Sequence, residues 1–142
     1  MTAQIELVEH FPEVEDYCRL RSLAGMSPKT AEAARKGLPN TLYGVSLRAD
    51  GQVIGMGRII GDGGCFYTVV DIAVLPAYQK QGLGKRIMVA LDAWLRANAQ
   101  PSAYVTLVAD GDARHLYAKF GFVETAPVSV NMEYMVGAND PA

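Results

Sequence analysis

The stretch Gln79-Lys80-Gln81-Gly82-Leu83-Gly84 joins an apolar run at 65–75 to a segment of helical periodicity. The run at 65–75 is the densest β-branched cluster of the chain and predicts a central strand. From Leu83 onward apolar residues recur at i, i+4, i+8, i+11 and i+12, which predicts an amphipathic helix. Glycines between a strand and a helix leave backbone N–H groups pointing outward at the helix N-terminus. This stretch therefore predicts an anion site.

Basic side chains crowd the start of the predicted helix. Lys80, Lys85 and Arg86 lie at the positive end of the helix macrodipole, where each cation costs about 0.3–1 kcal/mol unless an anion offsets it. A tight turn alone would leave this cluster unexplained. Gln79 and Arg86 occupy positions at which a Walker A loop needs Gly and Ser or Thr, and Ile87 stands in place of the third Rossmann glycine. The residues fit better a pyrophosphate that belongs to a ligand other than those of Walker A loops and Rossmann folds.

Length and composition predict one domain spanning 1–142, with a mass of 15.3 kDa. Thirteen basic against fifteen acidic side chains give a net charge of −2, which argues against a nucleic-acid partner. Neither a membrane span nor a signal-peptide pattern is found, so we expect a cytoplasmic protein with no membrane partner. Cys18 and Cys65 are too few for a disulfide framework, and no cluster has metal-ligand spacing, so we expect reduced thiols and no metal.

The remaining sequence predicts a mixed α/β protein in which hairpins and helices alternate. Asp50-Gly51 and the glycine-rich turn at 61–64 predict two consecutive hairpins. Further strands are expected at 4–10, 41–48, 52–60, 103–109 and 128–136, and further helices at 14–21, 29–36 and 112–119.

The pattern Gln-x-x-Gly-x-Gly after a strand resembles the acetyl-coenzyme A (acetyl-CoA) loop of the GNAT N-acetyltransferase family. The resemblance starts at Gly55-Met56-Gly57-Arg58 and continues through Asp71-Ile72-Ala73-Val74. It extends to Leu116-Tyr117-Ala118-Lys119-Phe120-Gly121-Phe122, which is similar to the family's second signature. It implies the GNAT fold, an α/β (α+β) domain whose mixed, mostly antiparallel twisted sheet has six to seven strands and about four flanking helices. It also implies acetyl-CoA-dependent transfer of an acetyl group directly to a primary amine.

The resemblance further implies where acetyl-CoA, the cosubstrate, would bind. The backbone of 72–74 would pair with the pantetheine arm as an added strand, and the N–H groups of 81–85 would hold the pyrophosphate. The residues expected there are Ile72, Ala73, Val74, Gln79, Lys80, Gln81, Gly82, Leu83, Gly84, Lys85, Tyr117 and Lys119.

Two residues are candidates for proton transfer. Tyr117, a phenol of pKa about 10, could protonate the departing coenzyme A thiolate, whose thiol has a pKa near 8.5. Alternatively, Tyr117 only packs in the buried stripe of a short helix. Asp71 interrupts the apolar central strand and is a candidate base, directly or through water, for an amine that is protonated at neutral pH. A structural hydrogen-bonding role for Asp71 is the equal alternative.

The acceptor amine is the part of the reaction about which the sequence says least. The segment 55–63 is most similar to the serotonin (arylalkylamine) N-acetyltransferase branch of plants and cyanobacteria, whereas 71–74 and 78–85 are also close to glucosamine-6-phosphate N-acetyltransferases. Apolar and aromatic candidates favour a flat small-molecule amine. A polyamine, an amino sugar phosphate, a protein amine or a non-catalytic acyl-CoA sensor remain alternatives, and a homodimer is left open. The candidate acceptor residues are Arg58, Tyr43, Phe66, Met132 and Tyr134.

Overall fold

The computed structural model describes residues 4–137. These residues form five strands, four helices and two short 3-10 turns. In order they are β1 (Ile5–Val8), α1 (Val14–Leu23), α2 (Ala31–Gly37), η1 (Leu38–Asn40), β2 (Tyr43–Ala49), β3 (Gln52–Gly61), β4 (Phe66–Val74), η2 (Pro76–Tyr78), α3 (Leu83–Asn98), β5 (Tyr104–Leu107) and α4 (Ala113–Ala118).

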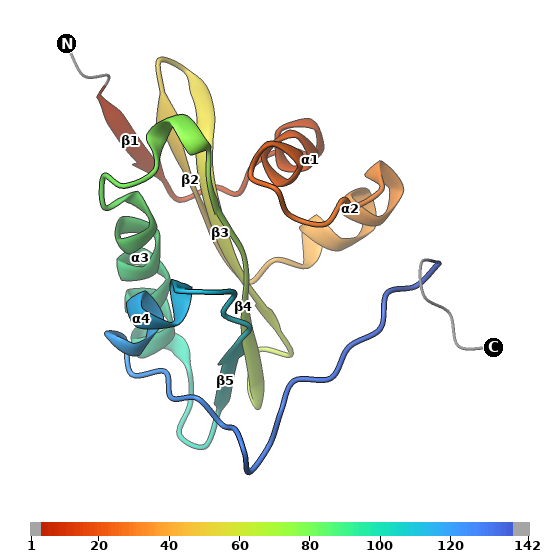
Figure 1. Ribbon diagram of the computed structural model, residues 1–142, viewed down its shortest axis with the longest axis vertical. Helices are drawn as coiled ribbons and strands as arrows, with labels where there is room; N and C mark the ends of the chain where they lie inside the picture. The colour runs from red at the N-terminus through yellow and green to blue at the C-terminus, as the bar shows by residue number, and fades with distance from the viewer. Residues whose placement is uncertain (1–3, 138–142) are drawn as a thin grey trace.

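One sheet organises the molecule, in the order β1-β2-β3-β4-β5. All neighbours are antiparallel except β4 and β5, which are parallel. Helices α1 and α2 cover one face, and α3 and α4 lie on the other (Figure 1). The mixed, mostly antiparallel sheet confirms the expected fold class. Its five strands are fewer than the predicted six to seven, because the segment expected as a strand at 128–136 is irregular chain outside the sheet.

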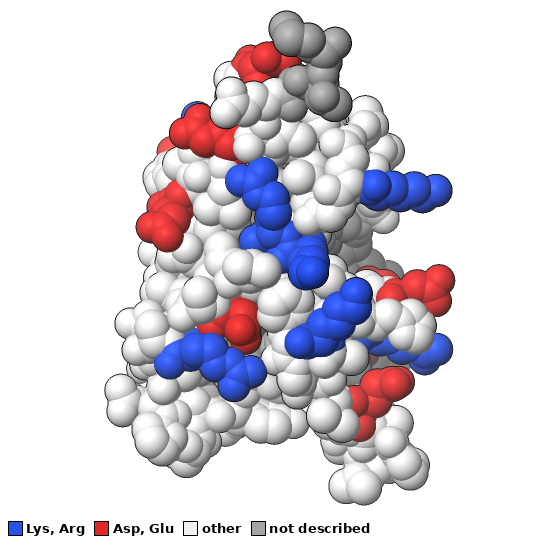
Figure 2. Space-filling view, turned by 90° about the vertical axis from the view of Figure 1, so that its left-hand side faces the viewer, with Lys and Arg blue, Asp and Glu red and all other residues white. Residues whose placement is uncertain are grey.

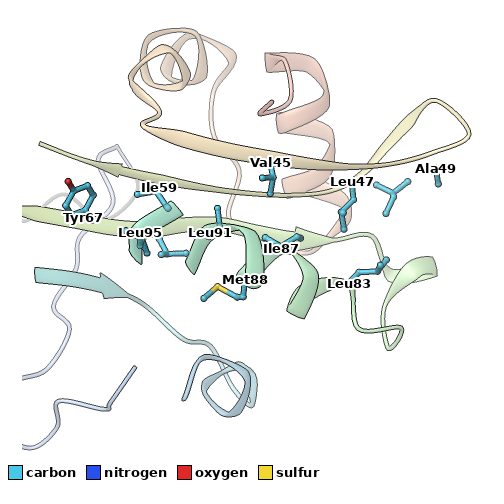
Figure 3. Packing of buried hydrophobic residues seen from close by; sticks show 12 residues of the cluster. Val45, Leu47, Ala49, Ile59, Tyr67, Leu83, Ile87, Met88, Leu91 and Leu95 are labelled. Carbon is cyan, nitrogen blue, oxygen red and sulfur yellow. The ribbon is translucent and has the colours of Figure 1, made fainter. Parts of the chain in front are cut away.

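The main core lies between the sheet and α3. Leu83, Ile87, Leu91 and Leu95 of α3 are buried against the strands, as the helical spacing predicts, and Met88 is buried with them (Figure 3). Strand β3 carries Gly57 at the closest approach of the helix: a Cβ at this position would lie 2.5 Å from the Cγ2 atom of Ile87. A glycine is therefore required for α3 to pack so closely on β3.

A second core lies on the opposite face, beneath α1. Tyr17 and Leu20 of α1 pack there with Val53 and Met56 of β3 and with Ala73 of β4. This cluster fixes α1 over the middle of β4, where the candidate residue Asp71 is located. The sheet is thus packed on both faces at the point where the predicted site begins.

Other expectations concern thiols, metals and membranes. Cys18 is half-buried and Cys65 exposed, both as free thiols. Among residues 4–137, side chains of His, Cys, Asp and Glu do not gather in any group that could hold a metal ion. In the same range, no helix combines the length and apolar character needed to cross a bilayer.

Candidate active site

Strands β4 and β5 separate part of the way along β4. Their parallel pairing joins Phe66–Val69 to Tyr104–Leu107 and ends where β5 ends. Strand β4 continues to Val74, still paired with β3 on its other side. Within the described chain, the backbone groups of 70–74 that point away from β3 therefore face no strand. An extended ligand could satisfy them as an added strand.

The N-terminus of α3 lies at the end of this open strand edge. Gly82 is its N-cap, with φ of 78° and no capping side chain. The first backbone hydrogen bond of the helix runs from the N–H of Arg86 to the carbonyl of Gly82, at 3.1 Å. The N–H groups of 83–85 thus have no acceptor within the helix and can donate hydrogen bonds to an anion.

Two hydrogen bonds fix the loop before α3. The Nε2 atom of Gln79 donates to the carbonyl of Val74 at 2.9 Å, which ties the loop to the end of β4. The Nη1 atom of Arg86 donates to the carbonyl of Ile5 at 3.0 Å, which ties α3 to β1. Arg86 therefore has a structural partner, whereas the sequence suggested only a phosphate contact for the basic cluster.

Basic side chains extend across the face formed by α3 and α4 (Figure 2). Lys80 and Lys85 are both exposed beside the first turn of α3. No acidic residue occurs in that first turn. The exposed cations of the loop, α3, α4 and the residue after α4 are Lys80, Lys85, Arg86, Arg96, Arg114 and Lys119. Phosphate oxygens at the helix terminus would be stabilised by this field.

Helix α4 brings Tyr117 to the same side of the sheet. A Cβ on Gly84 would lie 3.6 Å from Cδ2 of Leu116, so α4 packs beside the first turn of α3. Tyr117 is half-buried against the core. Burial raises the pKa of its phenol above 10.0, and the charge of Asp110 raises it further. His115, in the same helix, is exposed.

A β-bulge interrupts β4 at Asp71. Arg58 pairs with Val70 and Met56 with Ala73, so β4 has one residue more than β3 between these two pairs. Asp71 has φ of 60°, in the left-handed region that aspartate adopts more readily than most residues. The bulge turns its side chain towards α1.

The carboxylate of Asp71 is the centre of a buried polar network. Oδ1 accepts hydrogen bonds from Nη1 of Arg21 at 2.6 Å and from the hydroxyl of Tyr17 at 3.1 Å. Oδ2 accepts one from Nε of Arg58 at 2.7 Å. Burial, followed by the charge of Asp71, raises the pKa of Tyr17. Of about four lone-pair positions on a carboxylate, only one on Oδ2 is left for a further donor.

This network also engages Arg58, the anion-binding candidate. Its Nη1 atom donates to Oγ1 of Thr41 at 3.0 Å, and its guanidinium lies 5.4 Å from the ring centroid of Phe11. With its Nε on Asp71, Arg58 is used structurally, which is the salt-bridge alternative to anion binding. Tyr17 and Arg21 were not found from the sequence, because they lie on α1, about fifty residues from Asp71.

The other acceptor candidates do not meet in one cleft. Tyr43 stacks on Trp94 of α3 at 5.6 Å, on the face of the sheet opposite the Asp71 network. Burial and a hydrogen bond to Glu9 raise the pKa of Tyr43 to about 12. Phe66 is 61% exposed at the start of β4, and Met132 and Tyr134 are exposed in the irregular C-terminal segment.

A groove of about 470 Å³ lies beside the Asp71 network. It runs between the β1–α1 connection and the segment from α2 into β2. Phe11 and Thr41 line it and also contact Arg58, and Tyr43 forms part of its wall. Glu9 and Glu13 contribute carboxylates. Glu9 was not singled out in the sequence, because only the fold brings the β1–α1 connection beside the segment that leads into β2.

Comparison with known proteins gives a consistent picture. The family described as acetyltransferase (GNAT) domain matches residues 42–124. The uncharacterized N-acetyltransferase ycf52 of Pyropia yezoensis is 29% identical over 116 residues, covering 79% of this chain and 64% of the relative. Its namesake from Porphyra purpurea is 36% identical over 73 residues, covering 51% of this chain and 41% of the relative. The chain thus spans less than two thirds of the length of either relative.

Solved structures extend the similarity to nearly the whole chain. A protein of unknown function from meticillin-resistant Staphylococcus aureus, described as a probable acetyltransferase, has a TM-score of 0.89 and 48% identity. That match covers 93% of this chain and 99% of the other. Glucosamine-6-phosphate N-acetyltransferase from Arabidopsis thaliana has a TM-score of 0.67 at 15% identity, covering 94% of this chain and 99% of that one. The second likeness concerns the fold alone.

Proposed function

Because the chain belongs to the acetyltransferase (GNAT) domain family, we propose that it transfers an acetyl group from acetyl-CoA to the primary amine of a small molecule. The observation that carries this proposal is the adjacency of two features. The open edge of β4 at 70–74 leads into the uncapped N-terminus of α3. An extended pantetheine amide and a pyrophosphate are the two groups that such an edge and such a terminus accept.

The residues present fit this cosubstrate. Backbone groups of 72–74 would pair with the amides of the pantetheine arm, and the N–H groups at the start of α3 would hold the pyrophosphate. Lys80 and Lys85 would add positive charge there, and Lys119 lies just after α4, near Tyr117. Bound acetyl-CoA would supply an activated thioester, and the chain itself supplies binding, orientation and proton transfer.

We assign Tyr117 the role of general acid. Acetyl transfer forms a C–N bond and breaks the C–S bond, and the departing sulfur takes up a proton. The half-buried phenol of Tyr117 holds its proton up to pH 10 and beyond, because burial raises its pKa. It can therefore donate that proton throughout the physiological range.

Asp71 is proposed to act through water. Both oxygens already accept hydrogen bonds from guanidinium groups and a phenol, and the carboxylate is buried beneath α1. The remaining lone pair of Oδ2 can accept a hydrogen bond from a water that relays the amine proton to solvent. Asp71 is then chiefly a positioning residue, which keeps the β-bulge and the two arginines in place.

The acceptor is proposed to be an arylalkylamine-like compound. The groove beside Arg58 is lined by Phe11, by Tyr43 at the start of β2 and by Glu9. An ammonium group bound near carboxylates and an aromatic ring packed on apolar side chains suit this lining. Calorimetric titration with acetyl-CoA, followed by amine-dependent release of free coenzyme A thiol, tests binding and transfer separately.

A further inference from the structure

Phe11 of the β1–α1 connection lines the groove proposed for the acceptor and is held there by two other side chains. Its ring centroid lies 5.7 Å from that of Tyr17, with the ring planes tilted by 55°. The guanidinium of Arg58 lies 5.4 Å from the same ring. Tyr17 and Arg58 are themselves hydrogen-bonded to Asp71, so both are fixed in place. The ring of Phe11 is therefore kept in one position at the wall of the groove.

Gly44 of β2 packs against Phe11 and lines the same groove. A Cβ at this position would lie 2.8 Å from Cβ of Phe11, and 3.0 and 3.2 Å from its Cδ1 and Cγ. Turning the ring would not relieve a contact with Cβ, so a larger residue would displace Phe11 as a whole. The backbone of Gly44 is not left-handed. What this position requires is the absence of a side chain.

Phe11 lies on the side of the groove that leads to the open edge of β4. The groove has a second aromatic residue, Tyr43, but its ring is stacked on Trp94 of α3, on the opposite face of the sheet. Only Arg58 lies between Phe11 and the carboxylate of Asp71 in the chain of contacts. An acceptor in the groove whose amino group points towards β4 therefore has its carbon skeleton beside Phe11.

We infer that Phe11, kept in place by Gly44, is the residue that makes the acceptor site select an amine with an aromatic ring. The inference rests on the proposed function and assigns a specificity-determining residue to its acceptor site. A ring on the amine would pack against the ring of Phe11 in an offset or edge-to-face arrangement. Because Phe11 is already ordered, this contact would cost little further side-chain entropy. An aliphatic amine would lack the contact between rings.

Selectivity for phenethylamine over hexylamine tests this role. The ratio of the two kcat/KM values measures it in transfer, and the ratio of the two Kd values, obtained by calorimetry in the presence of coenzyme A, measures it in binding. Phe11→Leu keeps an apolar side chain and removes the ring, so both ratios should fall about two- to tenfold with KM for acetyl-CoA unchanged. Tyr104→Leu is the control, since it removes an exposed ring outside the groove and should leave both ratios unchanged.

Gly44→Ala provides a second test, because it retains the ring of Phe11 and displaces it. Both ratios should fall in this variant as well. Gly37→Ala is its control: a Cβ at Gly37 meets no atom within 4 Å, and Gly37 does not line the groove. Circular dichroism establishes that the variants are folded, and Phe11→Leu decides the question if Gly44→Ala does not fold.

Measuring binding and transfer separately distinguishes this inference from the proposed function. Selective binding of phenethylamine that is lost in Phe11→Leu supports the inference, even if no thiol is released and the proposed transfer fails. Transfer by the wild type with a selectivity that survives Phe11→Leu overturns the inference and leaves the proposed transfer standing. A wild type that binds phenethylamine no more tightly than hexylamine also overturns it, as does a folded Gly44→Ala variant with wild-type ratios.

Discussion

The Nε atom of Arg58 donates a 2.7 Å hydrogen bond to Oδ2 of Asp71, and the two side chains are only 11% and 5% exposed. Arg21 makes the equivalent contact with Oδ1 from the other side. One carboxylate is thus the shared partner of two buried guanidinium groups that belong to α1 and β3. Because desolvated charges are costly unless paired, this arrangement is sensitive to the loss of any member.

Asp71→Asn keeps the shape of the side chain and removes its charge. Two guanidinium groups would then remain buried without a counter-charge, so we expect the free energy of unfolding to fall by about 3–5 kcal/mol. Chemical denaturation measures this loss. Glu32→Gln is the matched control, because its ion pair with Lys36 is largely exposed and should contribute about 0–1 kcal/mol. Equal losses in the two variants would contradict the account of the Asp71 network.

Gly82→Val tests the anion site at the start of α3. A Cβ at this position meets no protein atom within 4 Å, so the side chain would occupy the space in which a pyrophosphate approaches the backbone. We expect acetyl-CoA affinity, measured by calorimetry, to fall by at least tenfold.

Gly51→Val is its control. Gly51 has the same φ of 78° and equally open surroundings in the β2–β3 hairpin. The Gly51→Val variant should have the same backbone strain as Gly82→Val but should bind acetyl-CoA normally. Similar affinities for the two folded variants would refute the site at α3.

Glu9→Gln tests the acceptor groove. Removing this carboxylate should raise KM for the amine roughly two- to tenfold, the range of an exposed charge-assisted contact, and leave KM for acetyl-CoA unchanged. Glu15→Gln is the control, since Glu15 is exposed on α1 and does not line the groove. If KM for the amine rises equally in Glu9→Gln and Glu15→Gln, the change in net charge causes the effect and the groove does not.

Tyr117→Phe removes the proposed acid and little else. We expect kcat to fall by roughly 10²–10⁴ with acetyl-CoA affinity retained, because the hydroxyl acts only in the transition state. Since burial raises the pKa of Tyr117 above 10.0, the wild-type kcat should not lose its acid before pH 10. Steady-state kinetics between pH 7 and 10 measure both effects. A variant with wild-type kcat would show that Tyr117 only packs against the core.

Local signals carried most of the fold prediction. β-Rich runs bounded by turn signals located β2, β3 and β4, and the 3.6-residue period of apolar residues located α3. These signals depend only on residues that are neighbours along the chain. The segment 128–136 also has the pattern of a strand, but it forms no backbone hydrogen bonds with another strand. Strand formation requires a neighbouring strand as well as a suitable sequence.

The candidate site was predicted only where it is made of consecutive residues. The loop at 79–84 and the helix carrying Tyr117 lie side by side, as the two motifs suggested. Tyr17 and Arg21 could not be assigned to Asp71 from the sequence, because a helix surface with charged residues looks the same whether or not a buried partner lies beneath it. Tyr43 has an alternating strand position, but the pattern does not say which face meets α3.

The most direct test of the central proposal is amine-dependent release of free coenzyme A thiol by the purified protein. Acetyl-CoA is supplied with separate panels of arylalkylamines, polyamines, amino acids, amino sugars and a lysine peptide. We predict selective release with tryptamine-like or phenethylamine-like amines. Silence across every panel, from folded protein that still binds acetyl-CoA, would contradict small-amine acetyl transfer.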